Sequence, residues 1–246
     1  MMTKLLAAIC LALLSVGAPA QAPGPDIVFQ DSMAQRLLAC TGCHGAQGRA
    51  GPDGYYPRLA GKPAGYLYNQ LRNFQAGRRH YALMVNLLDP LSERYLREIA
   101  DHFSNLDLPY VAAPPSLAVP ALLARGQALV EQGDRSRQLP ACQQCHGAAL
   151  MGVNPFIPSL LGLPRDYLNA QLGAWRTGER QANAPDCMAD IAKRLAPDDI
   201  AAVVSWLASR PVPVPSHPAN GLPQPMPLRC GSTQQAWPSG SMEAKP

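Results

Sequence analysis

A five-residue pattern occurs twice in this chain, and this repeat constrains the fold more than any other feature of the sequence. Cys40-Thr-Gly-Cys43-His44 returns 102 residues later as Cys142-Gln-Gln-Cys145-His146. Other residues recur after each motif with a drift of only one to three positions: Pro57, Leu59, Gly61, Tyr66, Gln70 and Met84 correspond to Pro158, Leu160, Gly162, Tyr167, Gln171 and Met188. Solenoid repeats are about 20–50 residues long, so a period near 100 residues indicates tandem domains.

The length of 246 residues and the distribution of the 26 prolines agree with two copies of one domain. Four prolines between residues 109 and 120 indicate a stiff linker. We predict five segments from this pattern. They are a signal peptide (1–22), an N-terminal domain (23–108), a Pro-rich linker (109–120), a C-terminal domain (121–210) and a Pro-rich C-terminal tail (211–246).

The first 22 residues have the pattern of a cleaved secretory signal. Lys4 precedes a short apolar run, and Ala18-Pro19-Ala20 is a small-x-small cleavage site. A run of about a dozen apolar residues is too short to span a membrane, and Cys10 lies in a poor lipoprotein motif. We therefore expect an exported, periplasmic protein with no integral membrane segment in the mature chain.

Each copy has the apolar spacing of helices, and the alternation typical of strands is absent. The ranges 32–39, 65–76 and 92–106 in the first copy, and 122–132, 166–177 and Pro197–Ser209 in the second, place apolar side chains three to four positions apart. Ser92 is a good N-cap, and Pro197 suits a first helical turn. The sequence predicts an all-α protein of two small domains.

The Cys-x-x-Cys-His motif places two thiols and an imidazole on the same face of a helical turn. Thiols in this arrangement add to the vinyl groups of haem, and the adjoining imidazole ligates the iron. Zinc ribbons also use Cys-x-x-Cys pairs, but they separate the pairs by roughly 15–20 residues. A thioredoxin-type pair needs a βαβ setting that is missing here. The net charge of +4 is too small and too evenly spread to indicate nucleic-acid binding.

The double motif, together with the downstream Pro-x-Leu-x-Gly and Tyr-Leu-x-x-Gln-Leu patterns and the methionines, resembles the tandem dihaem class I cytochromes c of the cytochrome c4 type. This resemblance implies two class I cytochrome c domains, each wrapped around a covalently bound haem c. It implies thioether bonds from both cysteine pairs, His44 and His146 as proximal ligands, and Met84 and Met188 as distal ligands. The carbonyls of Pro57 and Pro158 would orient the histidines, and Leu59 and Leu160 would line the haems.

The distal ligands have alternatives. A methionine is often a core residue, and His80 lies four residues before Met84. The second copy has Ala184 in the place of His80, so the repeat favours the methionines.

Cys187 and Cys230 lie outside the haem motifs. In an oxidising compartment we expect them to form a disulfide that fastens the Pro-rich tail beside Met188. Two unpaired thiols are the alternative.

Iron held by both His and Met has no open position for a substrate. We therefore expect an electron-transfer carrier rather than an enzyme, with a quinol-oxidising complex or a dehydrogenase as donor and a terminal oxidase or reductase as acceptor. A cytochrome subunit docked to a dehydrogenase is a close alternative, and a dihaem peroxidase is a more distant one.

Overall fold

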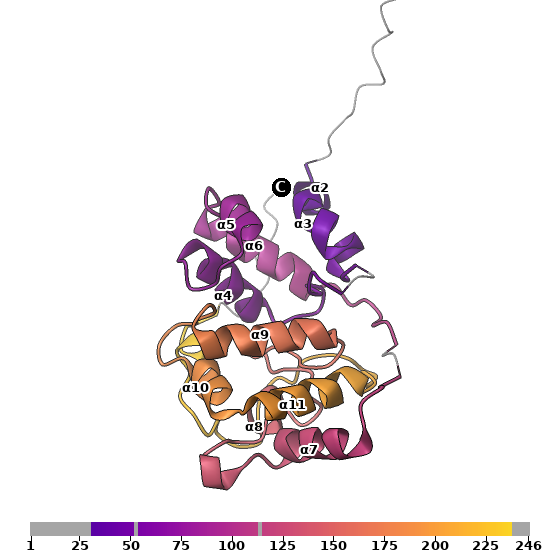
Figure 1. Cartoon of the computed structure of the whole chain (residues 1–246). Helices are drawn as coiled ribbons and strands as arrows, with labels where there is room; N and C mark the ends of the chain where they lie inside the picture. The colour runs from indigo at the N-terminus through magenta and orange to yellow at the C-terminus, as the bar shows by residue number, and fades with distance from the viewer. Residues whose placement is uncertain (1–30, 52–53, 113–114, 238–246) are drawn as a thin grey trace, which may run out of the picture. The chain divides into compact units, whose positions relative to one another are not determined.

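The structure, a computed structural model, describes residues 31–51, 54–112 and 115–237, and its secondary structure there is helical (Figure 1). Only isolated β-bridges occur in these ranges. The predicted signal peptide lies outside them, as do residues 113–114 of the linker and the end of the tail. None of the helices in the described ranges is long and apolar enough to cross a membrane.

The α-helices follow the same order in the two halves of the chain, but the 3-10 turn comes after the helix that ends at His44 and before the helix that ends at His146. The first half contains α2 (Met33–Arg36), α3 (Leu38–His44), η1 (Ala46–Gly48), α4 (Ala64–Gln75), α5 (Ala82–Leu88) and α6 (Glu93–Ser104). The second half contains α7 (Pro120–Glu131), η2 (Arg135–Arg137), α8 (Gln143–His146), α9 (Arg165–Thr177), α10 (Cys187–Arg194) and α11 (Pro197–Ser209), and η3 (Gly231–Thr233) follows in the tail.

Residue chemistry at the helix ends explains several of these boundaries. The Ser92 hydroxyl accepts a hydrogen bond from the Tyr95 amide and so caps α6. Pro197 occupies the first turn of α11, where its missing N–H costs nothing. The Asp186 carboxylate accepts a hydrogen bond from the Ala189 amide and begins α10, a short helix that the sequence analysis did not predict.

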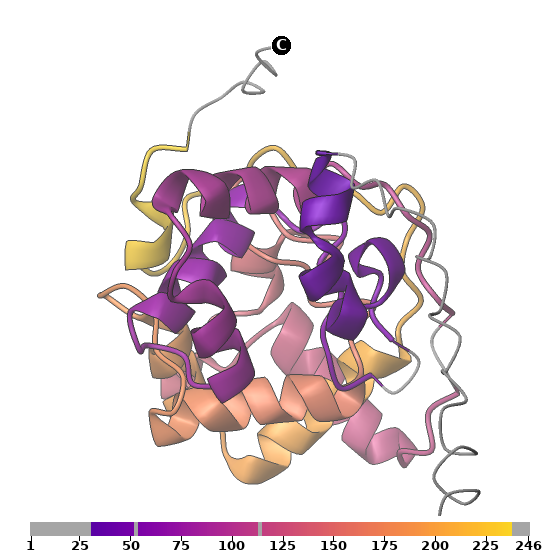
Figure 2. The ribbon, with the colours of Figure 1, turned by 90° about the horizontal axis from the view of Figure 1, so that it is seen from above.

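Each half has its own apolar core. In the second half α7 packs closely on α11, and Leu129, Val130 and Val204 are fully buried in the cluster between them. In the first half α4 packs on α6 (Figures 1 and 2). Leu96 and Phe103 are fully buried in the apolar cluster of this half. The all-α fold predicted from the periodicity is confirmed for the described residues.

The crossing of α7 and α11 requires a glycine. A Cβ atom at Gly126 would lie 2.2 Å from the Ala202 carbonyl oxygen and 2.8 Å from Trp206 Cβ. We expect Gly126→Ala to lower the free energy of unfolding by about 1–3 kcal/mol, because the two helices must separate to make room. Gly221→Ala is the control, since nothing lies within 4 Å of that position. Equal chemical denaturation midpoints for the two variants would contradict this packing.

Candidate functional site

The first Cys-x-x-Cys-His motif lies on one continuous helix. α3 carries Cys40, Cys43 and His44, so the two thiols and the imidazole occupy successive turns of one helical face. The His44 ring is 6% exposed, and its Nδ1 donates a 2.8 Å hydrogen bond to the Pro57 carbonyl. This bond places the ring proton on Nδ1 and leaves the Nε2 lone pair available for a metal.

The second motif is similar, but only Cys145 and His146 lie within α8, and Cys142 is the N-cap residue of that helix. His146 ends α8, is 7% exposed, and donates from Nδ1 to the Pro158 carbonyl at 2.8 Å. The loops that follow also correspond. The amides of Ala50 and Gly152 donate to the carbonyls of His44 and His146 at 2.8 and 3.0 Å respectively. The two halves therefore present two equivalent imidazoles, each held in the tautomer that suits an iron ligand.

Burial sets the protonation of these groups. It is the main cause that lowers the pKa of both His44 and His146, so the imidazoles are neutral and able to ligate. It also raises the pKa of the Cys40 thiol, and raises that of Cys142 to about 12. Redox-active Cys-x-x-Cys pairs have lowered thiol pKa values, so these pairs do not resemble a thioredoxin site.

The two cysteine pairs do not form a shared zinc site. In the described ranges no group of three or more His, Cys, Asp or Glu side chains is placed to hold a metal ion. The four motif cysteines are free of disulfides. Their thiols are thus available for covalent attachment, as the motif predicts.

The other predicted site residues lie close to the two cores. Leu59 and Met84 are half-buried against the core of the first half, and Leu160 packs against that of the second. Met188 is half-buried on α10, and His80 is exposed before α5. The roles of these residues as distal ligands and haem contacts remain predictions.

Two arginines at corresponding positions of the repeat, 101 residues apart, form a partly buried cluster between the halves. Arg79 and Arg180 pair through an isolated antiparallel bridge, and Arg180 is only 4% exposed. Each donates to a glutamine of the other half, Arg79 to Gln171 at 3.0 Å and Arg180 to Gln70 at 2.8 Å. Burial first, and then the charge of Arg79, lowers the pKa of Arg180.

This cluster contains no carboxylate partner: no salt bridge to Arg79 or Arg180 occurs within the described residues, although two adjacent guanidinium groups favour an anion. Carboxylates of a bound haem would supply the missing charge. The free thiols, the oriented imidazoles and these guanidinium groups together fit haem. Arg180 is buried in this cluster, whereas Arg79 is half-buried.

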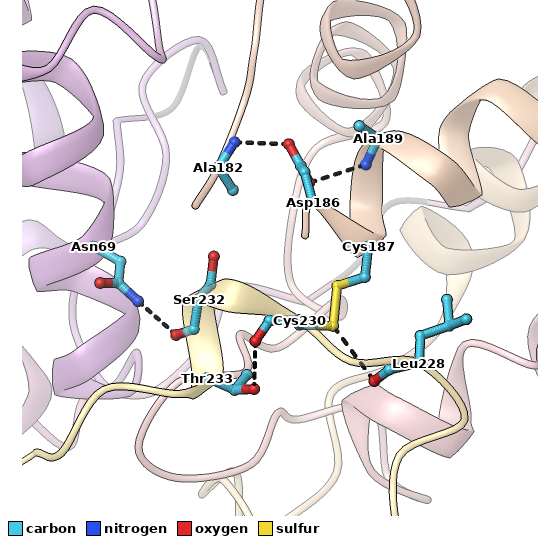
Figure 3. The surroundings of a disulfide bond; sticks show 9 residues. All are labelled: Asn69, Ala182, Asp186, Cys187, Ala189, Leu228, Cys230, Ser232 and Thr233. Carbon is cyan, nitrogen blue, oxygen red and sulfur yellow. Dashed lines mark hydrogen bonds between the residues drawn. A yellow bond between two sulfur atoms is a disulfide. The ribbon is translucent and has the colours of Figure 1, made fainter. Parts of the chain in front are cut away.

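The disulfide between Cys187 and Cys230 is confirmed, with a Cα–Cα distance of 5.2 Å (Figure 3). It joins the first residue of α10 to the Pro-rich tail, one residue before Met188. Beyond the bridge the tail contacts the first half. The Asn69 amide donates to the Ser232 carbonyl at 2.8 Å, and the Trp237 ring packs at 5.6 Å from that of Tyr68. The tail is therefore attached to both halves.

Loss of this bridge should weaken the fold. We expect Cys187→Ala with Cys230→Ala to lower the free energy of unfolding by about 4 kcal/mol or less, the chain-entropy value for a loop of this length. Calorimetry of the double variant measures the loss. Wild type with the disulfide intact and wild type with the disulfide chemically reduced are the comparisons. An unchanged midpoint in the double variant would contradict a stabilising role for the bridge.

Comparison with known proteins places the chain in a family. The cytochrome c family model matches residues 123–211, which form the second copy. The chain is 37% identical over 174 residues to the thiosulfate dehydrogenase electron acceptor of Thiomonas intermedia, covering 71% of this chain and 79% of the relative. It is 33% identical over 208 residues to cytochrome c4 of Pseudomonas aeruginosa, covering 84% and 98%.

Solved structures agree with these relatives. The structure of thiosulfate dehydrogenase (TsdBA) from Marichromatium purpuratum matches with a TM-score of 0.63 and 35% identity. The match covers 72% of this chain, and the chain spans 39% of that protein. Solved cytochrome c4 structures share the fold as well.

The fold and the two motifs define a class I cytochrome c. The chain belongs to the cytochrome c4 family, binds haem c covalently and transfers electrons.

Proposed function

We propose that this cytochrome carries two haems, one in each half of the chain. Cys40 and Cys43 would attach the first, and Cys142 and Cys145 the second. This assignment rests mainly on the similar environments of the two histidines. Both imidazoles are buried, and each donates a 2.8 Å hydrogen bond to a proline carbonyl. When bound, each haem iron alternates between its ferric and ferrous states and so accepts and releases one electron.

The remaining site residues would complete the coordination. We assign His44 and His146 as proximal ligands and Met84 and Met188 as distal ones. Thioether ligation favours the ferrous state and leaves no position open for a substrate. Leu59 and Leu160 would line the two haems and limit the access of water, which influences the reduction potentials. These roles support a carrier and not a dihaem peroxidase, which must lose a distal ligand.

For the electron donor we propose a dehydrogenase that oxidises thiosulfate. Two relatives at 37% and 36% identity are named thiosulfate dehydrogenase electron acceptors. Of the two donors expected from the sequence, a quinol-oxidising complex or a dehydrogenase, these relatives favour the dehydrogenase. We propose that the protein works in the periplasm and passes its electrons to a terminal oxidase or reductase.

A cytochrome subunit held on its dehydrogenase is the second candidate. It is favoured by the likeness to the much longer thiosulfate dehydrogenase (TsdBA), of which this chain spans 39%. Isolation of the native protein at low salt distinguishes the two. A soluble carrier elutes alone, whereas a subunit elutes with a dehydrogenase that oxidises thiosulfate.

Stopped-flow spectroscopy tests the donor. The ferric protein is mixed with a purified thiosulfate dehydrogenase and thiosulfate, and the reduced α-band is followed. We expect both haems to be reduced within the turnover time of the enzyme, with no reduction when either component is omitted. Reduction by a quinol-oxidising complex and quinol, but not by the dehydrogenase, would overturn the proposed donor.

A further inference from the structure

The first half of the chain places a buried cation against the second half. Lys62 is 3% exposed, and its ammonium group donates a hydrogen bond to the hydroxyl of Ser159, which is buried as well. Lys62 forms no salt bridge with any described residue. Burial of an ammonium group without a carboxylate partner costs free energy, so a function of Lys62 could explain why this residue is buried here.

The partner of Lys62 adjoins the proximal ligand loop of the second half. Ser159 directly follows Pro158, whose carbonyl accepts the Nδ1 hydrogen bond of His146. The ammonium group is close enough to affect the imidazole: burial is the main cause of the lowered pKa of His146, and the charge of Lys62 lowers it further. In a low-dielectric interior, an unscreened charge at this position acts strongly on nearby groups.

Backbone contacts hold this arrangement in place. The Tyr66 amide, at the start of α4, donates to the Pro155 carbonyl at 3.0 Å. A Cβ atom on Gly65 would lie 2.5 Å from the Phe156 ring, so only a glycine allows this approach. Lys62 precedes this contact by three residues and is thereby fixed in relation to the 155–159 loop. The ammonium group is positioned by the fold and is not a mobile surface charge.

The second copy has no lysine that could make the equivalent contact with the first copy. The residue that corresponds to Lys62 in the second copy is Leu163, and Arg58 corresponds to Ser159. Arg58 is buried too, but its guanidinium group contacts the linker: it donates to the Pro109 carbonyl at 3.1 Å, and its Cζ lies 3.9 Å from the centroid of the Tyr110 ring. Lys62 therefore lies in the first half of the chain but acts on the site in the second half, and no corresponding residue acts in the opposite direction.

We propose that Lys62 is an electrostatic positioning residue that raises the reduction potential of the iron bound at His146, and thereby sets the direction of electron sharing between the two sites. The inference rests on the proposed presence of two haems. Reduction removes one positive charge from the iron, so a nearby buried ammonium group favours the ferrous state. The first half thus contributes to the potential of the second.

The same charge should make this potential depend on pH. The pKa of Lys62 is lowered to about 7, chiefly by burial and then by Arg58. Two charged or titratable groups interact with Lys62. The charge of Arg58, on the same loop, lowers the pKa of Lys62, and the charge of Lys62 lowers the pKa of His146 on α8. Lys62 is charged below its pKa and neutral above it, so the potential of the second haem should fall as pH rises through the neutral range.

The test uses the holoprotein and two matched variants. Lys62→Gln removes the buried charge, and Lys193→Gln removes an exposed lysine of α10 in the second half. Haem stoichiometry is measured first. Redox titrations at pH 6 and pH 8 are then followed by NMR, with the paramagnetically shifted haem methyl signals assigned to each half. Replacement of a buried charge by a neutral group should leave the fold intact.

We expect Lys62→Gln to shift the equilibrium for electron sharing about tenfold away from the second haem at pH 6, which is about 59 mV for a one-electron couple. Lys193→Gln should change it little, because solvent screens that charge. The difference between pH 6 and pH 8 should also diminish in Lys62→Gln alone. Two haems with unshifted potentials, or equal shifts of both haems, would overturn the role of Lys62, whereas a single haem would overturn the proposed function instead.

Discussion

Replacement of Cys142 and Cys145 together by serine is expected to leave one covalently bound haem per chain where the wild type has two. Thioether bonds form only from cysteine thiols, and the serine hydroxyl does not replace them. The remaining haem should belong to the first half, whose own motif on α3 is intact. Mass spectrometry of the denatured protein, together with a pyridine haemochrome assay, measures the number.

The matched control exchanges Cys40 and Cys43 for serine and should leave one haem in the second half. Because the two proximal histidines are held by the same hydrogen bond, both double variants should lose one haem each. The outcome that contradicts the assignment is retention of two covalent haems in either variant.

Met188→Ala is expected to lower the potential of one haem by a substantial part of the roughly 0.8 V range that axial ligands control. Removal of the thioether leaves the sixth position of the iron open to water or another weak ligand, which stabilises the ferric state. The ferric protein should lose part of its far-red Met–iron band and show a high-spin component. Redox titration followed in the visible region measures both changes.

The control for this variant is Met151→Leu. Met151 lies in the same half but is only 2% exposed within the apolar core, so the substitution preserves volume and should leave the potential unchanged. If Met151→Leu shifted the potential and Met188→Ala did not, the distal ligand would be wrongly assigned.

Local signals in the sequence predicted most helices correctly. The Ser92 cap and Pro197 mark the starts of α6 and α11. The short helices α5 and α10 were not predicted as helices, although they carry Met84 and Met188. Each has only seven or eight residues, too few to show a helical period, so the Asp186 cap was the only local signal for α10.

The contacts between the two halves could not be predicted from this single sequence. Lys62 and Ser159 are separated by 97 residues, and nothing near either residue indicates the pairing. Arg79 and Arg180 occupy corresponding positions of the repeat, but this correspondence does not show that the two residues meet or that Arg180 is buried. The disulfide was predictable because only two cysteines remained outside the motifs and the predicted signal peptide, whereas the contact of Trp237 with Tyr68 depends on the path of the tail.

The central claim is that two six-coordinate haems transfer electrons in this chain. A redox-titrated visible spectrum of the purified wild type, combined with haem stoichiometry, tests it most directly. We expect two c-type haems per chain, a low-spin ferric spectrum with the far-red Met–iron band, and two one-electron steps. A single haem, or high-spin iron in the resting protein, would contradict the account.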